Sequence, residues 1–156
     1  MKNPTIIYIV IGVILLLLLI NKKVMGLAGM VTNFSVRNDS NGLGTFGSKR
    51  DGHTHQGLDI RATKGEKIKA PFDLTYVYSA PVYKDDTKYI ASEYKTKNGT
   101  FKVMYMIPIA GKKVFKQGEV IGIAQSISEK WGNSMLDHIH VEIRESGTLK
   151  NPANYV

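Results

Sequence analysis

The hexapeptide His138–Ile143 (HIHVEI) constrains the fold more than any other stretch of this 156-residue chain. Its polar and apolar residues alternate, which is typical of a β-strand with one face turned to a core. The apolar side chains would pack inward, and the other face would carry three polar ones: His138, His140 and Glu142. Two imidazoles side by side on a rigid strand suit a metal ion, or a metal ion and a catalytic base.

The other two histidines, His53 and His55, lie far upstream, and Asp59 follows four residues after His55. All four histidines of the protein therefore fall into two short motifs, which favours a shared site over independent structural roles. The chain has no cysteine, so thiolate ligands and disulfides are excluded. A metal would be held by nitrogen and oxygen atoms, and histidine with aspartate suits Zn²⁺.

From residue 42 onward the chain consists of short β-rich runs separated by glycine and proline. Three such runs are 74–78 (LTYVY), 101–106 (FKVMYM) and 120–123 (VIGI). This spacing predicts a mainly β, antiparallel domain over residues 42–156 rather than alternating βαβ units.

Residues 5–20 (TIIYIVIGVILLLLLI) form an apolar run without amphipathic spacing, and the apolar residues 24–31 extend it. The run is either a membrane segment or a cleavable signal peptide. We favour a single transmembrane helix as an uncleaved anchor over residues 1–31, contacting the lipid membrane through residues 5–31, with 32–41 as a linker. Its orientation stays open, because Lys2 on one side competes with Lys22 and Lys23 on the other.

The net charge of +8 suits an acidic partner such as an anionic lipid or wall polymer, and equally a lysine-rich soluble surface. The sequence has no helix-turn-helix, RNA-binding signature or basic-aromatic run. We therefore expect no nucleic-acid partner.

From about residue 42 to the end, the motifs and their order resemble the lysostaphin-like, LytM-type zinc metallopeptidases. The matching segments are 44–50 (GTFGSKR), 55–60 (HQGLDI), 62–65 (ATKG), 70–71 (AP), 114–122 (VFKQGEVIG), 138–143 (HIHVEI) and 151–155 (NPANY). The resemblance implies an antiparallel β-sheet with a groove and a single zinc ion on its floor.

Carried over residue by residue, the resemblance implies that His55, Asp59 and His140 are the zinc ligands. Three protein ligands with an open fourth position are typical of catalytic rather than structural zinc. His138 would be the general base that orients or deprotonates water. Glu142 is either a partner of a ligand or an exposed strand carboxylate.

The sequence departs from the family at one position of consequence. Many members carry a further histidine in a Tyr-x-His segment, where this chain reads 104–108 (MYMIP) with Ile107 in place of the histidine. Losing a donor to the developing oxyanion would leave a slow enzyme, one that uses another donor, or no enzyme. His53 is either a substitute or an exposed loop residue. Residues 124–136 also lack the family's glycine-threonine-glycine run, so the groove wall is expected to differ.

The leading hypothesis is a membrane-anchored zinc endopeptidase that hydrolyses peptide cross-links of bacterial peptidoglycan, with its domain facing the wall. It would either remodel the wall of its own cell or act as a virion-associated lytic enzyme of a membrane-containing bacteriophage, with envelope or virion assembly partners. The alternatives are a non-catalytic module of the same fold that binds peptidoglycan or a partner protein, and a purely structural zinc site.

Overall fold

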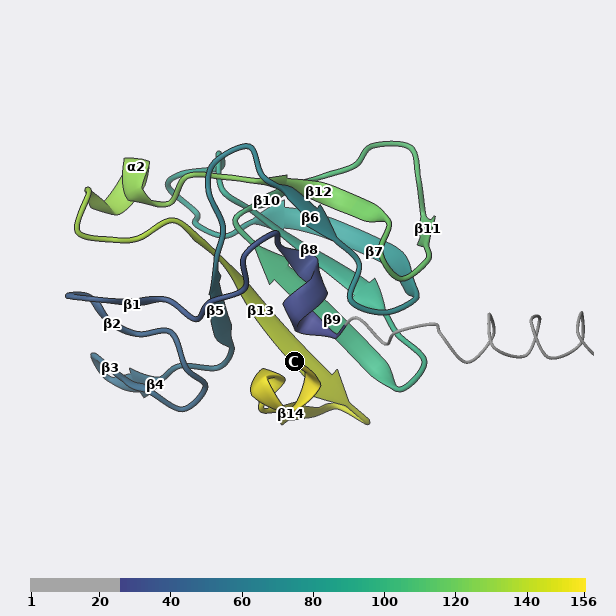
Figure 1. The fold of residues 1–156 in the computed structure, drawn as a ribbon, viewed down its shortest axis with the longest axis horizontal. Coiled ribbons are helices and arrows are strands. Elements are labelled where there is room, and N and C mark those ends of the chain that lie inside the picture. The colour runs from purple at the N-terminus through teal and green to yellow at the C-terminus, as the bar shows by residue number, and fades with distance from the viewer. Residues whose placement is uncertain (1–25) are drawn as a thin grey trace, which may run out of the picture.

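A computed structural model of the chain describes residues 26–156, which form a mainly β domain (Figure 1). Every strand pairing in this part of the chain is antiparallel, so the predicted fold class is confirmed for the domain. Within residues 26–156, no helix is long and apolar enough to cross a membrane. Of the anchor predicted over residues 1–31, with lipid contact through residues 5–31, residues 1–25 lie outside the described residues.

The largest sheet has seven strands. Its spatial order is β11 (Val114–Phe115), β7 (Leu74–Pro81), β8 (Ile90–Lys95), β9 (Gly99–Met104), β13 (His138–Glu145) and β14 (Thr148–Lys150), with β5 (Leu58–Arg61) paired to β13. A second sheet of three strands lies against it, in the order β10 (Met106–Pro108), β12 (Val120–Ala124) and β6 (Lys67–Lys69) (Figure 1).

The hydrophobic core fills the space enclosed by these sheets, and it follows the alternation expected of half-buried strands. Ile68 of β6, Ile121 of β12 and Phe101 of β9 are fully buried. On β13, Ile139 and Val141 are also fully buried, as the sequence pattern predicts. Burial of large apolar side chains on this scale is the main favourable term for folding.

Strand β13 is the structural centre of the domain, because it has neighbours along both edges. One edge pairs with β9 over residues 140–145. The other edge pairs first with β5, over residues 138–141, and then with β14, over residues 143–145. The polar face of β13 is therefore held in a fixed register against β5.

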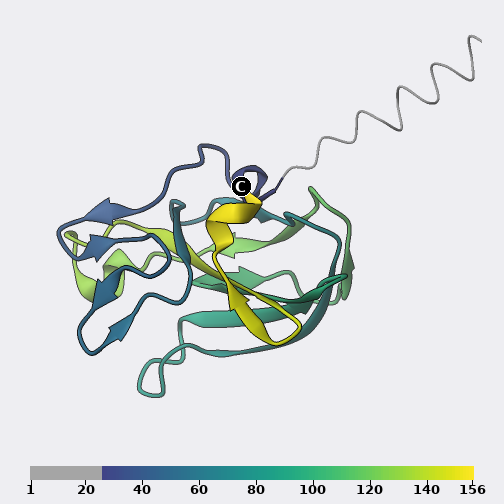
Figure 2. The same cartoon turned by 90° about the horizontal axis from the view of Figure 1, so that it is seen from below.

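Two short hairpins and one short helix lie together at one end of the molecule, beside the start of β13 (Figures 1 and 2). The hairpins are β1 (Asn38–Asp39) with β2 (Gly42–Leu43), and β3 (Lys49–Arg50) with β4 (His53–Thr54). The helix is α2 (Ser128–Trp131). It falls within the segment 124–136, where the groove wall was expected to differ.

The domain includes residues that were assigned to the anchor flank and the linker. The 3-10 helix η1 (Leu27–Met30) packs against β6 and the C-terminal 3-10 helix η2 (Pro152–Tyr155), and Leu27 and Met30 are fully buried. Val36 forms a β-bridge with Ile60. Residues 26–41 are thus part of the folded domain, which corrects the predicted boundary at residue 42.

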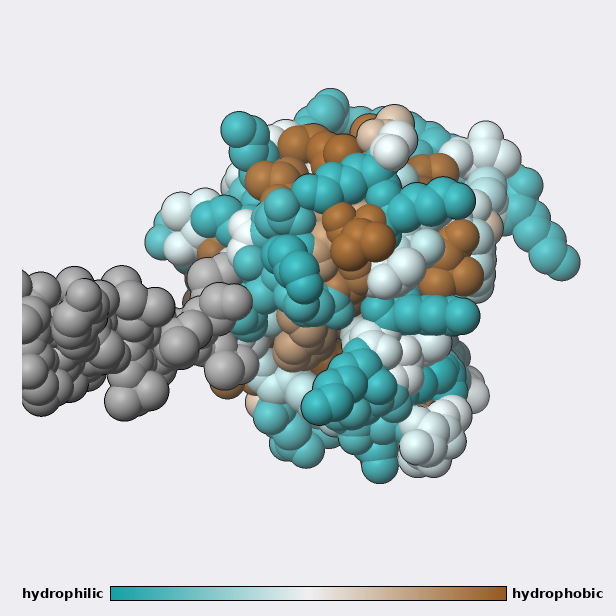
Figure 3. Space-filling view, turned by 90° about the vertical axis from the view of Figure 1, so that its right-hand side faces the viewer, coloured by the Kyte–Doolittle hydropathy of each residue, from teal (hydrophilic) through white to brown (hydrophobic). Residues whose placement is uncertain are grey.

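On one face of the domain, the exposed hydrophobic residues are scattered rather than gathered into one large patch (Figure 3). On the face drawn in Figure 3, hydrophobic patches are small and are separated by hydrophilic residues. Such scattering is ordinary for a protein surface and marks no docking site on that face.

Candidate metal centre

The β5–β13 ladder places the candidate ligands opposite each other. Asp59 on β5 is the register partner of His140 on β13. His55 lies in the connection just before β5, and Gly57 allows this connection to pass close to β13. A Cβ atom at Gly57 would lie 2.4 Å from the Val141 carbonyl oxygen and 2.5 Å from the His140 ring. Only glycine fits this close approach.

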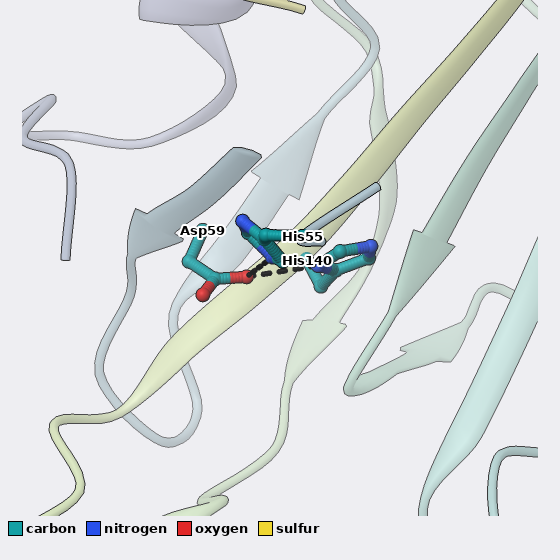
Figure 4. Close-up of side chains that lie close together, drawn as sticks. All are labelled: His55, Asp59 and His140. Atoms are coloured by element: carbon teal, nitrogen blue, oxygen red, sulfur yellow. Dashed lines mark hydrogen bonds and ion pairs between the residues drawn. The ribbon is translucent and has the colours of Figure 1, made fainter. Parts of the chain in front are cut away.

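Three ligand-type atoms converge from these residues (Figure 4). Oδ1 of Asp59 lies 2.8 Å from Nδ1 of His140 and 3.0 Å from Nε2 of His55. The two histidine nitrogens are 3.0 Å apart. All three residues are almost completely buried. The structure therefore brings together the three residues that the sequence analysis selected as ligands.

This donor set fits a zinc ion. Ligand atoms about 2.1 Å from a tetrahedral zinc lie roughly 3.4 Å from one another. The three atoms here are separated by 2.8 to 3.0 Å, so they would need to open by only a few tenths of an ångström. Two nitrogens and one carboxylate oxygen also leave a fourth position for water or substrate.

Polar contacts hold both imidazoles in orientations suited to metal binding. Nδ1 of His55 lies 2.9 Å from the Thr45 carbonyl oxygen, which can only accept, so Nδ1 carries the proton and Nε2 is free to bind a metal. Nε2 of His140 lies 3.5 Å from Oε1 of Glu142. Glu142 is buried, so it is not the exposed strand carboxylate of the alternative interpretation. Such partners orient ligands and raise their basicity.

Asp59 is kept ionised by its surroundings. Burial raises the pKa of this carboxyl group, but its close contacts with the imidazoles of His140 and His55 outweigh burial and hold the pKa well below its usual range. The other carboxylate oxygen, Oδ2, accepts a hydrogen bond from Nε of Arg37 at 3.1 Å. An ionised carboxylate is the form that binds a metal.

Arg37 is a residue of the site that the sequence analysis missed. It was assigned to the linker, yet it is 3% exposed and is paired with both Asp59 and Asp39, the latter at 2.6 Å. Its side chain is thus a buried cation behind the candidate ligand Asp59. No motif signals this role, because the pairing depends on residues 22 positions apart in sequence.

His138 lies beside the cluster without joining it. Its Nε2 is 3.9 Å from Oδ1 of Asp59, and its Nδ1 donates to the Leu136 carbonyl oxygen at 2.7 Å. Burial lowers the pKa of His138, and nearby Asp59 only partly opposes this. The ring is therefore neutral at pH 7, with Nε2 unprotonated and available to accept a proton.

Ile107 and His53 both lie away from the centre of the cluster. Ile107 is 54% exposed on β10, where it is the register partner of Ile123, and it does not line the hollow that contains the cluster. His53 is exposed on β4 at the rim of that hollow, and its Nδ1 lies 3.0 Å from the Asp51 carbonyl oxygen. The structure thus agrees with the exposed-residue interpretation of His53.

Tyr105 is a second residue that the sequence analysis did not select. It follows β9 with a φ of 64°, a left-handed conformation that is uncommon for a residue other than glycine. Its ring meets the His138 ring edge to face, with centroids 5.4 Å apart. Its hydroxyl is 3.0 Å from that of Tyr83, which in turn accepts a hydrogen bond from Nε1 of Trp131 at 3.3 Å. Burial raises the pKa of Tyr105, so the phenol keeps its proton.

The candidate ligands and their neighbours line a hollow of about 320 Å³. The ligand cluster and His138 lie within it, and Tyr105 and the half-exposed Trp131 form part of its wall. A site of this kind, with a metal-type cluster, a neutral imidazole and a protonated phenol, is suited to hydrolysis of an acyl bond.

No protein-family model matches the sequence. Among curated proteins, Leukocyte cell-derived chemotaxin-2 from Bos taurus is 28% identical over 152 residues, which cover 93% of this chain and 97% of that protein.

Solved structures share the fold. Csd3 of Helicobacter pylori superimposes with a TM-score of 0.56 at 21% identity, over 81% of this chain and 33% of Csd3, so this chain spans about a third of that protein. The catalytic domain of a mutant of the prophage-encoded M23 protein EnpA from Enterococcus faecalis gives 0.54 at 23% identity, covering 78% of this chain and 91% of that domain. The catalytic domain of lysostaphin from Staphylococcus simulans gives 0.53 at 19% identity, with coverage of 78% and 91%. The fold is therefore that of M23 and lysostaphin-type peptidase domains.

Proposed function

We propose that this protein is a zinc endopeptidase that hydrolyses peptide cross-links of bacterial peptidoglycan. The observation that carries the proposal is the convergence of one oxygen and two nitrogen atoms within 3.0 Å of one another, with the free Nε2 of His138 next to them. The fold shared with M23 and lysostaphin-type peptidase domains supports the same reaction.

The proposed mechanism assigns one task to each side chain. His55, Asp59 and His140 would hold Zn²⁺, which when bound polarises a carbonyl group and lowers the pKa of water. His138 would accept the proton of the attacking water through Nε2 and pass it to the leaving amine. Tyr105 would donate a hydrogen bond from its hydroxyl to the oxygen of the scissile carbonyl as negative charge develops there, and would keep its proton.

Tyr105 can serve as a donor because of the hydrogen bonds behind it. The indole N–H of Trp131 can only donate, so it donates to the Tyr83 oxygen. When the Tyr83 hydroxyl then donates to the Tyr105 oxygen, the Tyr105 proton is free for the substrate. This arrangement supplies a donor beside His138 without a histidine at position 107.

The proposal extends to location. The apolar residues 5–20 would anchor the chain in a membrane, with the domain facing the wall of the cell or of a host that a virion enters. The basic composition suits an anionic wall.

The proposal is tested with the full chain loaded with zinc and incubated with purified peptidoglycans that differ in their cross-links. Mass spectrometry of the released fragments should show new peptide ends, and their masses identify the bond. His138→Ala should keep zinc and lose cleavage, whereas His140→Ala should lose both. A protein that binds zinc and cleaves no type of peptidoglycan would contradict the proposal.

A non-catalytic binding module of the same fold is the second candidate. Two observations favour it: Ile107 replaces the family's histidine, and a relative of similar length is named a chemotaxin. The two candidates differ in what His138→Ala does, because a binding module should keep its function with this change and a peptidase should not.

A further inference from the structure

A second, larger hollow lies outside the candidate metal centre. Its volume is about 860 Å³, and it lies between residues 32–35, the end of β5 and strand β6. It shares no lining residue with the hollow that contains the ligand cluster. Four of its lining side chains are cations: Arg61, Lys64, Lys67 and Lys69.

This hollow, called the groove below, is also lined by two acidic residues, Glu66 and Asp137, which accept hydrogen bonds from uncharged donors. The two carboxylate oxygens of Glu66 accept hydrogen bonds from the backbone N–H groups of Thr32 at 2.8 Å and Thr63 at 3.1 Å. Oδ1 of Asp137 accepts from the backbone N–H of Ser128 at 2.9 Å and from the Ser126 hydroxyl at 3.0 Å. Neither carboxylate is paired with a cation of the groove.

Three of the four cations therefore lack a charged partner. Lys64 pairs with Glu129. Arg61, Lys67 and Lys69 are exposed and form no ion pair with any residue of the described range 26–156. These three unpaired cations outnumber the two carboxylates of the groove, so its lining carries a net positive charge, which attracts anionic ligands.

The geometry suits a linear ligand with repeated charges. Lys67 and Lys69 lie on the same face of β6, about 6.6 Å apart along the strand, because successive side chains alternate. Between them, Ile68 points into the core and is fully buried, which fixes this strand. Arg61 stands at the end of β5, opposite His138 in the ladder. The cations thus sit on ordered strands rather than on a loose tail.

We propose that this groove binds a linear polyanion, a chain that carries phosphate diesters or carboxylates at regular intervals. Arg61, Lys67 and Lys69 would each contact one anionic group. The groove has no aromatic lining residue on which the bases of a single-stranded nucleic acid could stack. Its concave shape also fits a flexible chain better than the flat surface of a lipid bilayer.

The proposal is tested by titrating short-chain polyphosphate into the full chain by calorimetry at several salt concentrations. Replacing the three cations (Arg61→Gln, Lys67→Gln and Lys69→Gln) should weaken binding at least about tenfold. A plot of the logarithm of the binding constant against the logarithm of the salt concentration should become less steep, by roughly 0.7 in slope for each lost contact. A matched control replaces Lys95, Lys97 and Lys113, which are also exposed and form no ion pair within residues 26–156, with Gln. This control removes the same net charge and should leave the affinity nearly unchanged.

Equal weakening by both triple variants would overturn the proposal, because binding would then follow net charge alone. Preferential binding to phosphatidylglycerol vesicles or to a single-stranded oligonucleotide would overturn it in favour of a lipid or nucleic-acid surface. Circular dichroism checks that the variants are folded, and Lys69→Glu alone should also weaken binding. The inactive His138→Ala variant should bind polyphosphate like the wild type, so this test is independent of the proposed peptidase activity.

Discussion

The Nδ1 atom of His140 lies 2.8 Å from Oδ1 of Asp59, and the two residues are register partners in the β5–β13 ladder. The backbone pairing of two strands therefore sets the distance between two candidate metal ligands. A ligand pair fixed in this way is preorganised, and little reorganisation is needed when a metal binds. The third ligand, His55, reaches the pair from a connection, with its ring held by the Thr45 carbonyl.

Asp59→Asn should abolish zinc binding under conditions in which the wild type binds zinc at a ratio of one per chain. The amide is a neutral and weaker ligand, and it leaves the Arg37 cation without one of its two carboxylates. Metal content after dialysis measures the effect. Wild-type chain at a zinc concentration 100 times the dissociation constant should also gain about 2.7 kcal/mol in the free energy of unfolding, and Asp59→Asn should not. Full zinc content in Asp59→Asn would contradict the assignment of this ligand.

Arg37→Gln should destabilise the metal-free domain by about 3 kcal/mol, because it removes a buried cation from between two carboxylates. The loss should be smaller with zinc bound, since the metal compensates the charge of Asp59. Urea unfolding with and without zinc measures both values. Lys116→Gln, which breaks the exposed ion pair with Asp73, is the control and should change stability little in either state. If Arg37→Gln lowered the free energy of unfolding equally with and without zinc, the charge of Arg37 would not be coupled to metal binding.

The alternation of polar and apolar residues in His138–Ile143 sufficed to predict the central strand and its buried apolar face, because side chains of a strand point alternately to its two faces. The family resemblance implied His55, Asp59 and His140 as zinc ligands, and the structure brings these three residues together. They meet because their motifs lie on or beside β5 and β13, and these two strands pair.

The remaining features depend on contacts that no local pattern encodes. Arg37 belongs to a polar, turn-rich segment, and only its long-range pairing with Asp59 brings it into the site. Leu27 and Met30 follow an apolar run, so their hydrophobicity was attributed to the anchor, whereas they pack in the domain core. Tyr105 enters the site through a left-handed backbone conformation at the end of β9, which sequence propensity does not predict.

Tyr105→Phe should lower kcat about 100-fold, because it removes only the hydroxyl that would donate to the developing oxyanion. The ring contact with His138 remains, so zinc content and thermal stability should be nearly unchanged. A tetrahedral phosphinate analogue of the substrate should also bind more weakly, while the binding of an uncleaved planar peptide should change little. Unchanged kcat in Tyr105→Phe would exclude this role.

Ile107→His is the complementary test, since it restores the residue that many members of the resembling family carry. The side chain at position 107 is half exposed on β10 and does not line the hollow of the cluster. We therefore expect no gain in kcat from Ile107→His, and no rescue of Tyr105→Phe by it. A large gain, measured with the same peptidoglycan fragment, would show that this side chain reaches the site.

Gly57→Ala should weaken zinc binding roughly 10- to 100-fold, because its Cβ atom would lie 2.5 Å from Nε2 of His140 and displace that ring. The change adds one methyl group and leaves every ligand in place, so it tests geometry rather than ligand chemistry. Gly111→Ala is the matched control. It has a left-handed φ of 76° and no neighbour within 4 Å of the added Cβ, so it should cost about 1 kcal/mol of stability and leave the zinc affinity unchanged. Zinc titrations and thermal unfolding of both variants separate the two effects. If both variants bound zinc as the wild type does, the close approach at Gly57 would not be what positions His140.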